Sequence, residues 1–519
     1  MNLTQGLHRC VQQSPERVAI IFGERMQTFR ELRSRVARLA GALQRLGMST
    51  GERVGMLAVN SDRYLEYLLG VWWGGGVVNP VNVRWSVPEI VYSLDDCDTR
   101  ILIVDDHFLP MAPKIAGTAR CRPVLVYAGE GATPSGMLSY EELIASASPV
   151  DDAFRGGDDL AAIMYTGGTT GQSKGVMQSH LNLWSSAVTR MAEYRHFDDT
   201  TISLHAAPLF HIGAMARAVG HFIAGDTHVV LPTFDPRAVL DTIERHKVEE
   251  LLLVPTMLQS VLAHPDFASR DLSSLKRIYY GASPISAAVL DAALAALPSI
   301  EFYHAYGLTE ASPVVSVNPP VNHEAAARSS GLYRSAGRPS LGVTVRIVDQ
   351  DGVEVPRNTV GEIVVRGANV MRGYWNKPEE TAHALRDGWL HTGDGAYMDD
   401  DGYLFIVDRM KDMIVSGGEN VYSAEVENAL SRHPAVVQCA VIGIPNARWG
   451  EAVHAVVVVR PGSNPSGDDL REHCRQFIAG YKCPKSVEFR SDMPLSAAGK
   501  ILKRDLRARY WENERRQVS

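Results

Sequence analysis

Apolar and polar residues follow one another along this chain with two periods, one typical of strands and one typical of helices. Short β-branched runs recur through the first 400 residues, and the segment between Thr28 and Gly47 has the helical period. The apolar positions of that segment are Leu32, Val36, Leu39, Leu43 and Leu46. Thr28 and Glu31 form a capping-box pattern, and Gly47 suits the end of the helix. The alternation of strands with helices predicts an α/β fold with layered, largely parallel sheets.

The pattern changes near Lys411, after which the predicted elements are short. They are helices over 424–433 and 466–481 and strands over 436–444, 451–459 and 485–490. Together they predict a small α+β unit of about 100 residues, which is near the usual size of a domain. We therefore expect a large N-terminal domain over residues 1–410 and a small C-terminal domain over residues 411–519.

The composition is ordinary for a soluble globular protein, with 45% hydrophobic and 21% charged residues in 519. A net charge of −7 without a basic stretch argues against nucleic acid or an anionic membrane surface as a partner. We expect no transmembrane segment, because no apolar run approaches about 18 residues, and no secretory signal. Six scattered cysteines without a CxxC pair favour reduced thiols and a cytoplasmic location.

One loop is unusually rich in glycine and threonine: "YTGGTTGQSKGV", residues 165–176. A flexible surface turn would explain its four glycines, but not three threonines and a lysine at close spacing. A phosphate cradle explains all of them, because glycines let backbone N–H groups approach an anion while hydroxyls and lysine add donors and charge. The Walker pattern is excluded because Ser173 directly precedes Lys174, and the GxGxxG pattern also fails.

The loop resembles the signature of the adenylate-forming superfamily, which contains acyl-CoA synthetases, peptide-synthetase adenylation domains and beetle luciferases. Gly167 stands where the family usually has serine, and Ser173 where it usually has proline. Neither change removes the other hydroxyls or the lysine. The resemblance implies ATP binding by Thr166, Gly167, Gly168, Thr169, Thr170 and Lys174, with Thr170 also near the metal ion.

Five further stretches match the same family in the same order, so that the resemblance spans about residue 10 to residue 510. They are "PLFHIGAM" (208–215), "YGASPIS" (280–286), "HAYGLTE" (304–310), "GWLHTGD" (388–394) and "PLSAAGKILKRDL" (494–506). Singly, each has a simpler explanation, such as a strand-ending turn, a capping pair or a solvated lysine. Their joint order favours a binding site.

The resemblance gives these stretches roles in nucleotide binding. Gly281, Ala282 and Ser283 would form one wall of the adenine pocket, and Ala305 and Gly307 would also bind ATP. Tyr306 would lie against the adenine face, since an aromatic ring stacks on a flat base. Asp394 would accept hydrogen bonds from the ribose hydroxyls, and Arg409 would contact the ribose or phosphate.

It also implies four catalytic residues. Lys500 would bridge the substrate carboxylate and the α-phosphate of ATP, and His211 would line the acyl channel. Thr309 would donate to the α-phosphate. Glu310 would hold Mg²⁺, a hard cation that prefers carboxylate oxygens.

A last stretch, "SGGENVYSAEVE" (416–427), resembles the family loop that lines the pantetheine tunnel. Gly417 and Gly418 would leave space for the thiol arm of CoA, whereas Ser423 stands where the family usually has proline. Lys500 and this loop belong to the same small domain, which cannot present both to one site at once. A mobile domain that rotates at Lys411 between half-reactions would resolve this conflict.

We therefore expect an acyl-CoA ligase that uses ATP, Mg²⁺ and CoA on a medium- or long-chain fatty acid or an arylpropenoic acid. Transfer to a carrier protein is the first alternative. It is less favoured because no aspartate lies near residues 208–215 to hold an amino acid, and only 19 residues follow Lys500. A luciferase-like oxygenase would share the adenylation motifs, and a non-catalytic nucleotide sensor would not need Lys500 with Glu310. The sequence leaves open whether the protein forms a homodimer.

Overall fold

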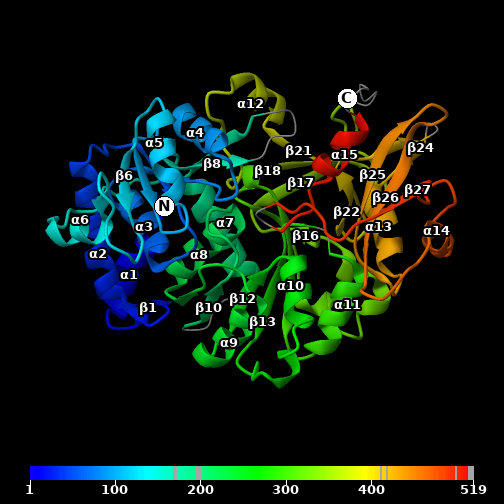
Figure 1. The fold of residues 1–519 in the computed structure, drawn as a ribbon, viewed down its shortest axis with the longest axis horizontal. Helices are drawn as coiled ribbons and strands as arrows, with labels where there is room; N and C mark the ends of the chain where they lie inside the picture. Colours follow the sequence, from blue (N-terminus) through cyan, green and yellow to red (C-terminus); the bar gives the residue numbers. More distant parts are fainter. Residues whose placement is uncertain are drawn as a thin grey trace.

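Four β-sheets organise the part of the chain that is described by the computed structural model (Figure 1). That part comprises residues 1–166, 172–194, 200–283, 285–409, 412–416, 419–496 and 499–511. Its larger helices before residue 400 are α1 (Gln5–Gln13), α2 (Phe29–Arg45), α3 (Asp62–Trp73), α4 (Val87–Asp96), α5 (Ala112–Thr118), α6 (Tyr140–Ser146), α7 (His180–Glu193), α8 (Ile212–Ala224), α9 (Pro236–His246), α10 (Pro255–Leu262), α11 (Ala287–Ala296) and α12 (Pro378–Ala384).

The first sheet has the strand order β19-β9-β8-β4-β3-β5-β6-β7. Its strands are β3 (Arg53–Leu57), β4 (Val77–Pro80), β5 (Ile101–Val104), β6 (Val124–Tyr127), β7 (Leu138–Ser139), β8 (Leu160–Thr166), β9 (Lys174–Ser179) and β19 (Gly373–Tyr374). Strands β3 to β8 pair in parallel, and β9 and β19 continue the sheet antiparallel. The short apolar runs at β3, β5 and β6 form strands, in agreement with the strand period of the sequence.

The second sheet has the order β16-β15-β14-β13-β12-β10-β11-β1-β2. Its strands are β1 (Val18–Phe22), β2 (Arg25–Thr28), β10 (Ile202–His205), β11 (Thr227–Val230), β12 (Glu250–Leu253), β13 (Arg277–Gly281), β14 (Glu301–Gly307), β15 (Val314–Asn318) and β16 (Arg338–Pro339). Its centre, from β1 to β14, is parallel. One continuous apolar core contains residues of both sheets and of α1, α2, α3 and α8, so the two sheets form a single packed body.

Helix α2 begins with the capping box and ends just before the glycine that the sequence predicted. The Thr28 side chain accepts from the Glu31 N–H, and the Glu31 carboxylate accepts from the Thr28 N–H, as the capping box requires. Gly47 follows the helix with a φ of +101°, which favours glycine. The apolar stripe of α2 packs on α3, whose Trp72 and Trp73 are fully buried.

The third sheet differs from the prediction of largely parallel strands up to residue 400. It contains β17 (Val343–Val348), β18 (Gly361–Gly367), β20 (Leu385–Arg386), β21 (Trp389–Met398) and β22 (Leu404–Arg409), and every pairing in it is antiparallel. Hairpin connections such as the turn at Asp399–Tyr403 replace the long helical crossovers that parallel neighbours need.

The C-terminal elements form a fourth sheet with its own apolar core (Figure 1, orange to red). They are β23 (Ile414–Ser416), β24 (Glu419–Val421), α13 (Ser423–Ser431), β25 (Val436–Asn446), β26 (Gly450–Val459), α14 (Gly467–Arg475), β27 (Ser486–Phe489) and α15 (Lys503–Trp511). Each predicted C-terminal element is found, although α14 ends at Arg475, earlier than predicted. The third sheet ends at Arg409 and the fourth begins at Ile414. The predicted boundary at residues 410–411 lies outside the described residues and stays a prediction.

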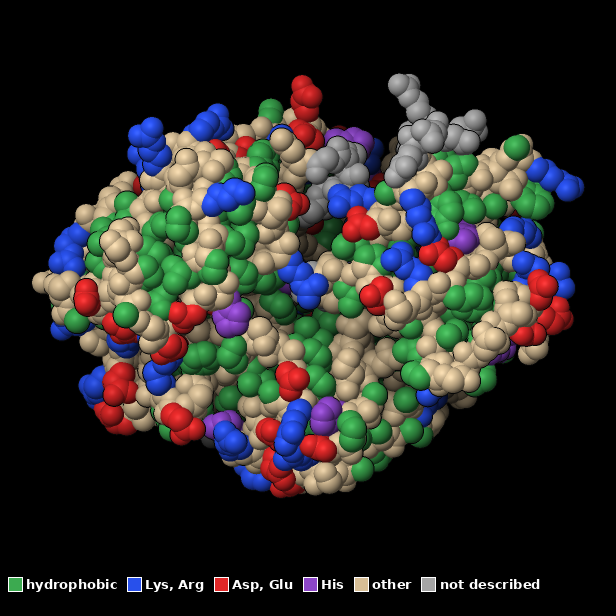
Figure 2. Space-filling model, viewed as in Figure 1, with side chains coloured by type: hydrophobic (Ala, Val, Ile, Leu, Met, Phe, Trp, Pro, Cys, Tyr) green, Lys and Arg blue, Asp and Glu red, His purple; other side chains and the backbone are tan. Residues whose placement is uncertain are grey.

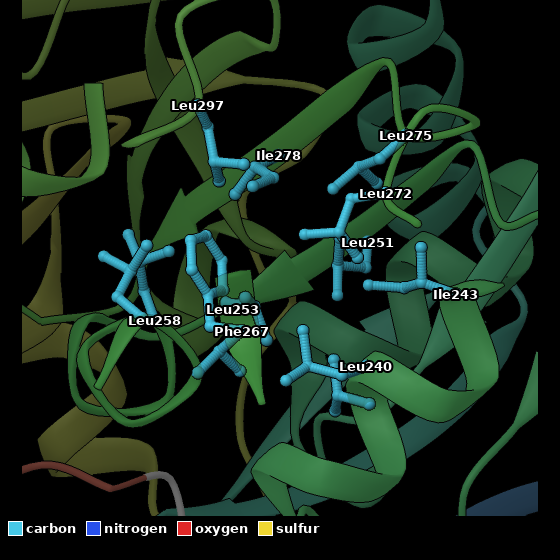
Figure 3. Close-up of a pocket in the computed structure, with 13 residues that line it drawn as sticks. Leu240, Ile243, Leu251, Leu253, Leu258, Phe267, Leu272, Leu275, Ile278 and Leu297 are labelled. Carbon is cyan, nitrogen blue, oxygen red and sulfur yellow. The ribbon is translucent and has the colours of Figure 1, made fainter. Parts of the chain in front are cut away.

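An apolar recess lies under the second sheet (Figure 3). Leu240 and Ile243 of α9, Leu258 of α10, Leu251 and Leu253 of β12 and Ile278 of β13 surround it. All of its lining residues are apolar, and it has room for no more than about one water molecule, so it is a gap in packing and not a site.

Within the described ranges, no helix is both long and apolar enough to cross a membrane. All six cysteines are free thiols, as the scattered spacing predicted.

Candidate active site

The glycine–threonine stretch connects two antiparallel strands, β8 and β9, whose ends pair Thr166 with Lys174. Residues 167–171 lie outside the described residues, so Gly167, Gly168, Thr169 and Thr170 are not located. At the base of the loop, the Lys174 Nζ lies 5.0 Å from the centroid of the Tyr374 ring. The Tyr374 hydroxyl donates to Glu310 Oε1 at 2.9 Å. The base of the predicted phosphate loop therefore lies beside the predicted metal ligand.

The predicted adenine wall is built from two parallel strands that end together. Gly281, the last residue of β13, pairs with Ala305 of β14. A Cβ on Gly281 would lie 2.2 Å from the Ala305 carbonyl oxygen, and one on Gly307 would lie 1.8 Å from the Pro313 carbonyl oxygen. These backbones therefore approach too closely for any other residue. Ala282, which has a φ of +66°, and Ser283 continue the chain outside the carboxyl ends of the strands, where open α/β sheets bind ligands.

Tyr306, Asp394 and Arg409 form one hydrogen-bonded group. The Tyr306 hydroxyl donates to Asp394 Oδ2 at 2.7 Å, and the Arg409 Nε lies 3.2 Å from Asp394 Oδ1. Asp394 and Arg409 are paired across β21 and β22, so the sheet register sets their contact. The Asp394 N–H donates to the Thr392 hydroxyl at 3.1 Å, which further fixes the buried aspartate.

Thr309 and Glu310 lie in a single 3₁₀ turn, Thr309–Ala311, that is held by its backbone. The Gln178 side-chain amide donates to the Thr309 carbonyl at 2.7 Å, and the Met371 N–H donates to the Glu310 carbonyl at 2.8 Å. The Asn369 amide donates to the Ala311 carbonyl at 2.9 Å. These contacts leave the Thr309 hydroxyl and the Glu310 carboxylate as the chemical groups that the turn presents.

Lys500 enters the same site from the C-terminal part of the chain. Gly499, with a φ of +72°, accepts at its carbonyl from the Thr256 hydroxyl at 3.3 Å, and a Cβ there would lie 2.7 Å from that hydroxyl. Burial and the Arg409 charge lower the pKa of Lys500 to about 8, against the opposing effect of the Asp394 and Glu310 carboxylates. Lys500 therefore shares one electrostatic environment with all three.

His211 directly precedes α8 and belongs to this environment as well. Burial, with the charges of Lys500 and Arg84, lowers the pKa of His211 to about 3. The ring is therefore neutral at physiological pH. Its Nε2 is buried and has no hydrogen-bond partner among the described residues, so it is available to a ligand.

Figure 2 shows that this face of the molecule is hollowed between the N-terminal helices and the C-terminal elements. The Arg84 side chain donates to the Leu495 carbonyl at 3.4 Å, and the Thr256 hydroxyl donates to the Gly499 carbonyl, so that both contacts join the N-terminal part of the chain to the C-terminal elements. These contacts hold the segment that contains Lys500 against the N-terminal part of the chain, where the charges of Glu310, Asp394 and Arg409 act on this lysine. Gly417, Gly418 and Lys411 lie outside the described residues.

Four supporting residues were missed by the sequence reasoning: Gln178, Thr256, Asn369 and Tyr374. Gln178 is a buried amide that directly follows the apolar residues Val176 and Met177 of β9, and that could have marked it. Tyr374 lies outside the quoted stretches and 64 residues from Glu310 in sequence, and the pairing of β19 with β9 positions it.

Comparison with known proteins agrees with this geometry. A model of the AMP-binding enzyme family matches residues 7–375, and a model of the AMP-binding enzyme C-terminal domain matches residues 425–500. The chain belongs to the AMP-binding enzyme family. Our identification of an adenylate-forming enzyme, made from the motifs, is confirmed.

Relatives of this chain align with nearly its whole length. A feruloyl-CoA synthase of Amycolatopsis sp is 42% identical over 97% of this chain and 98% of its own. The fatty acid–[acyl-carrier-protein] ligase ScoC of Streptomyces coeruleorubidus is 37% identical over 98% of this chain and 96% of its own. The crystal structure of the anthranilate CoA ligase AuaEII with anthranoyl-AMP has a TM-score of 0.90 at 28% identity, covering 98% and 97% of the two chains.

These findings confirm the predicted α/β fold and the predicted enzyme class, an adenylate-forming acid–thiol ligase. The roles of individual residues and the domain boundary stay predictions.

Proposed function

We propose that this family member joins a carboxylic acid to the thiol of CoA in two half-reactions. In the first, a carboxylate oxygen attacks the α-phosphorus of ATP, the bond to the bridging oxygen breaks, and pyrophosphate leaves. In the second, the CoA sulfur attacks the acyl carbonyl, the bond to the AMP oxygen breaks, and the thiol proton is lost. The observation that supports this best is that the Arg84–Leu495 and Thr256–Gly499 contacts hold the Lys500 segment against the N-terminal part, where the charges of Glu310, Asp394 and Arg409 act on Lys500.

The first half-reaction builds negative charge on the α-phosphate, and catalysis consists mainly of stabilising that charge with groups already in place. Lys500 supplies a cation, and the Thr309 hydroxyl supplies a donor from a turn that Gln178 holds. Lys174 supplies a second cation at the base of the phosphate loop. Asp394, already oriented by Tyr306, is suited to accept from ribose hydroxyls. The carboxylate of the substrate is itself the nucleophile, so that no side-chain nucleophile is required.

Glu310 fits a magnesium site, because Mg²⁺ usually binds one or two carboxylates together with phosphate oxygens and waters. The Tyr374 hydroxyl donates to one oxygen of the Glu310 carboxylate and so orients it, which leaves the other carboxylate oxygen for the ion. Bound there, the ion would offset charge on the phosphates. Thr170 stays a predicted second ligand.

The substrate that we favour is an arylpropenoic acid, with medium- and long-chain fatty acids next. The relative with 42% identity is a feruloyl-CoA synthase, and a neutral His211 beside apolar α8 residues suits an uncharged acyl group. CoA binding by Gly417 and Gly418 and a homodimer stay predictions.

Transfer to an acyl carrier protein is a second candidate, since the relative ScoC is named as such a ligase. A panel of arylpropenoic, benzoic and fatty acids, assayed for pyrophosphate release, tests the first half-reaction. Thioester formation with CoA, and separately with a carrier protein bearing its phosphopantetheine arm, distinguishes the two acceptors. No pyrophosphate release with any acid would contradict the proposal.

A further inference from the structure

Ser423, the first residue of α13, is fully buried and faces the third sheet instead of its own helix. Its N–H and its hydroxyl both donate to Asp408 Oδ2, each at 2.6 Å. Asp408 lies in β22, and its other carboxylate oxygen accepts from the Arg409 N–H at 2.8 Å. These hydrogen bonds therefore connect the sheet that carries Asp394 with the C-terminal elements that carry Lys500.

The Ser423 hydroxyl is held from its other side by Lys503 of α15. Lys503 Nζ donates to the Ser423 Oγ and lies 2.7 Å from Glu427 Oε1. Burial alone would lower the pKa of Lys503, but the Glu427 and Asp408 carboxylates raise it, so this lysine is charged. A hydroxyl that accepts from Lys503 has its hydrogen free for Asp408. The result is one continuous chain of contacts, Asp408–Ser423–Lys503–Glu427, that begins in β22 and ends in α13.

Helix stability does not explain the serine. The N-cap residue of α13 is Tyr422, and Ser423 occupies the first helical position, where proline is well suited because its fixed φ matches the helix. Proline is also the residue that the family usually has there. It has neither an N–H nor a hydroxyl, so it could make neither hydrogen bond to Asp408. The serine thus adds contacts to β22 that the family's usual residue lacks.

We propose that Ser423 is a positioning residue that favours the orientation for adenylation over the orientation for thioester formation. This rests on the proposed function and on the expectation from the sequence that its two half-reactions need different orientations of the C-terminal elements. A rotation at residues 410–411 would leave Asp408 with β22 and carry Ser423 away from it. Both hydrogen bonds to the carboxylate would then break, and Lys500, three residues before Lys503, would leave the site.

The test is to measure the two half-reactions separately in the full-length enzyme. Acyl-adenylate formation is followed by pyrophosphate release, and thioester formation is followed with synthetic acyl-adenylate and CoA. Ser423→Ala removes the hydroxyl and keeps the N–H, whereas Ser423→Pro removes both. Since a hydrogen bond to a charged group commonly contributes about tenfold to an equilibrium, we expect adenylation to fall about tenfold in Ser423→Ala and further in Ser423→Pro. The thioester half-reaction should be unchanged or faster in both.

Ser431→Ala is the matched control, because Ser431 lies on the same helix and its exposed hydroxyl donates only to the Asn428 carbonyl. It should change neither rate. If Ser423→Ala is poorly folded, Ser423→Thr provides a second test. Threonine keeps both the N–H and the hydroxyl, so this variant should have the wild-type ratio of the two rates. A parallel loss of both half-reactions, or an unchanged ratio in Ser423→Pro, would overturn the proposal. Failure of the wild-type enzyme in either half-reaction would instead count against the proposed function.

Discussion

The Tyr306 hydroxyl donates a 2.7 Å hydrogen bond to Asp394 Oδ2 and so joins the second sheet to the third. Tyr306 lies in β14, next to the backbone of the predicted adenine wall, and Asp394 lies in β21. The Arg409 Nε holds the other carboxylate oxygen at 3.2 Å. An aspartate fixed at both oxygens has little freedom left to lose, so its predicted contact with ribose is prepared before the nucleotide arrives.

Tyr306→Phe should therefore weaken ATP binding more than it slows chemistry. The substitution keeps the ring but removes the donor to a carboxylate, a hydrogen bond of about 1.5–3 kcal/mol. We expect the KM for ATP to rise about tenfold or more, with a smaller change in kcat, in steady-state pyrophosphate release. Tyr397→Phe is the control, since Tyr397 lies in β21 with Asp394 but its ring stacks on Phe405. Equal effects of the two substitutions would refute the assignment.

Lys500→Ala should abolish the first half-reaction selectively. Removing one charge-stabilising group commonly lowers a rate by about 10²–10³-fold, and Lys500 is predicted to stabilise the charge that develops on the α-phosphate. Conversion of preformed acyl-adenylate with CoA should continue, because that step is predicted to use the glycine loop instead. Lys276→Ala, which removes an exposed partner of Glu249, serves as the control. A similar loss in both half-reactions would mean that one orientation serves both.

The fall in adenylation activity at alkaline pH should result from deprotonation of Lys500. Burial and Arg409 lower its pKa to about 8, so the lysine is charged below that pH and neutral above it. Because the charged form is the catalytic one, kcat/KM for adenylation should fall as the pH rises through about 8. Lys500→Arg keeps its charge at every accessible pH and should lose this decline, whatever its absolute rate. A decline that persists in the arginine variant would have to come from another group.

The Mg²⁺ concentration that adenylation requires should change when Glu310 is replaced and, to a smaller extent, when Tyr374 is replaced. Glu310→Gln removes a negative ligand and should raise the Mg²⁺ concentration for half-maximal adenylation by at least about tenfold. Tyr374→Phe removes the donor that orients Glu310 but keeps the ring beneath Lys174, so a smaller increase is expected. Both are measured by titrating Mg²⁺ at fixed ATP. An unchanged requirement in Glu310→Gln would remove that residue from the metal site.

Local signals in the sequence predicted much of the fold because they act over short range. The capping box at Thr28 and the C-terminal elements are examples, since each depends on neighbours a few residues apart. The antiparallel third sheet was missed, because pairing direction depends on connections whose path the apolar pattern does not encode.

The same distinction applies to the site. Residues in compact motifs, such as Thr309 with Glu310, could be proposed from the sequence, and they stay predictions. Those that support them from distant strands, such as Gln178 and Tyr374, meet them only after the sheets form.

The turn between the two orientations is predicted at Lys411, which lies between the end of β22 at Arg409 and the start of β23 at Ile414. Proline fixes φ near −65° and removes the N–H, so Lys411→Pro should prevent the backbone rotation that the second half-reaction requires. The orientation that brings Lys500 to the site should persist, since the Arg84 and Thr256 contacts and the Ser423–Asp408 bonds all stabilise it. The variant should form acyl-adenylate in a single turnover and exchange pyrophosphate with ATP, while thioester formation falls by orders of magnitude. Lys411→Ala, which leaves the backbone free to turn, should retain both steps. Full thioester formation by Lys411→Pro would mean that the chain turns elsewhere.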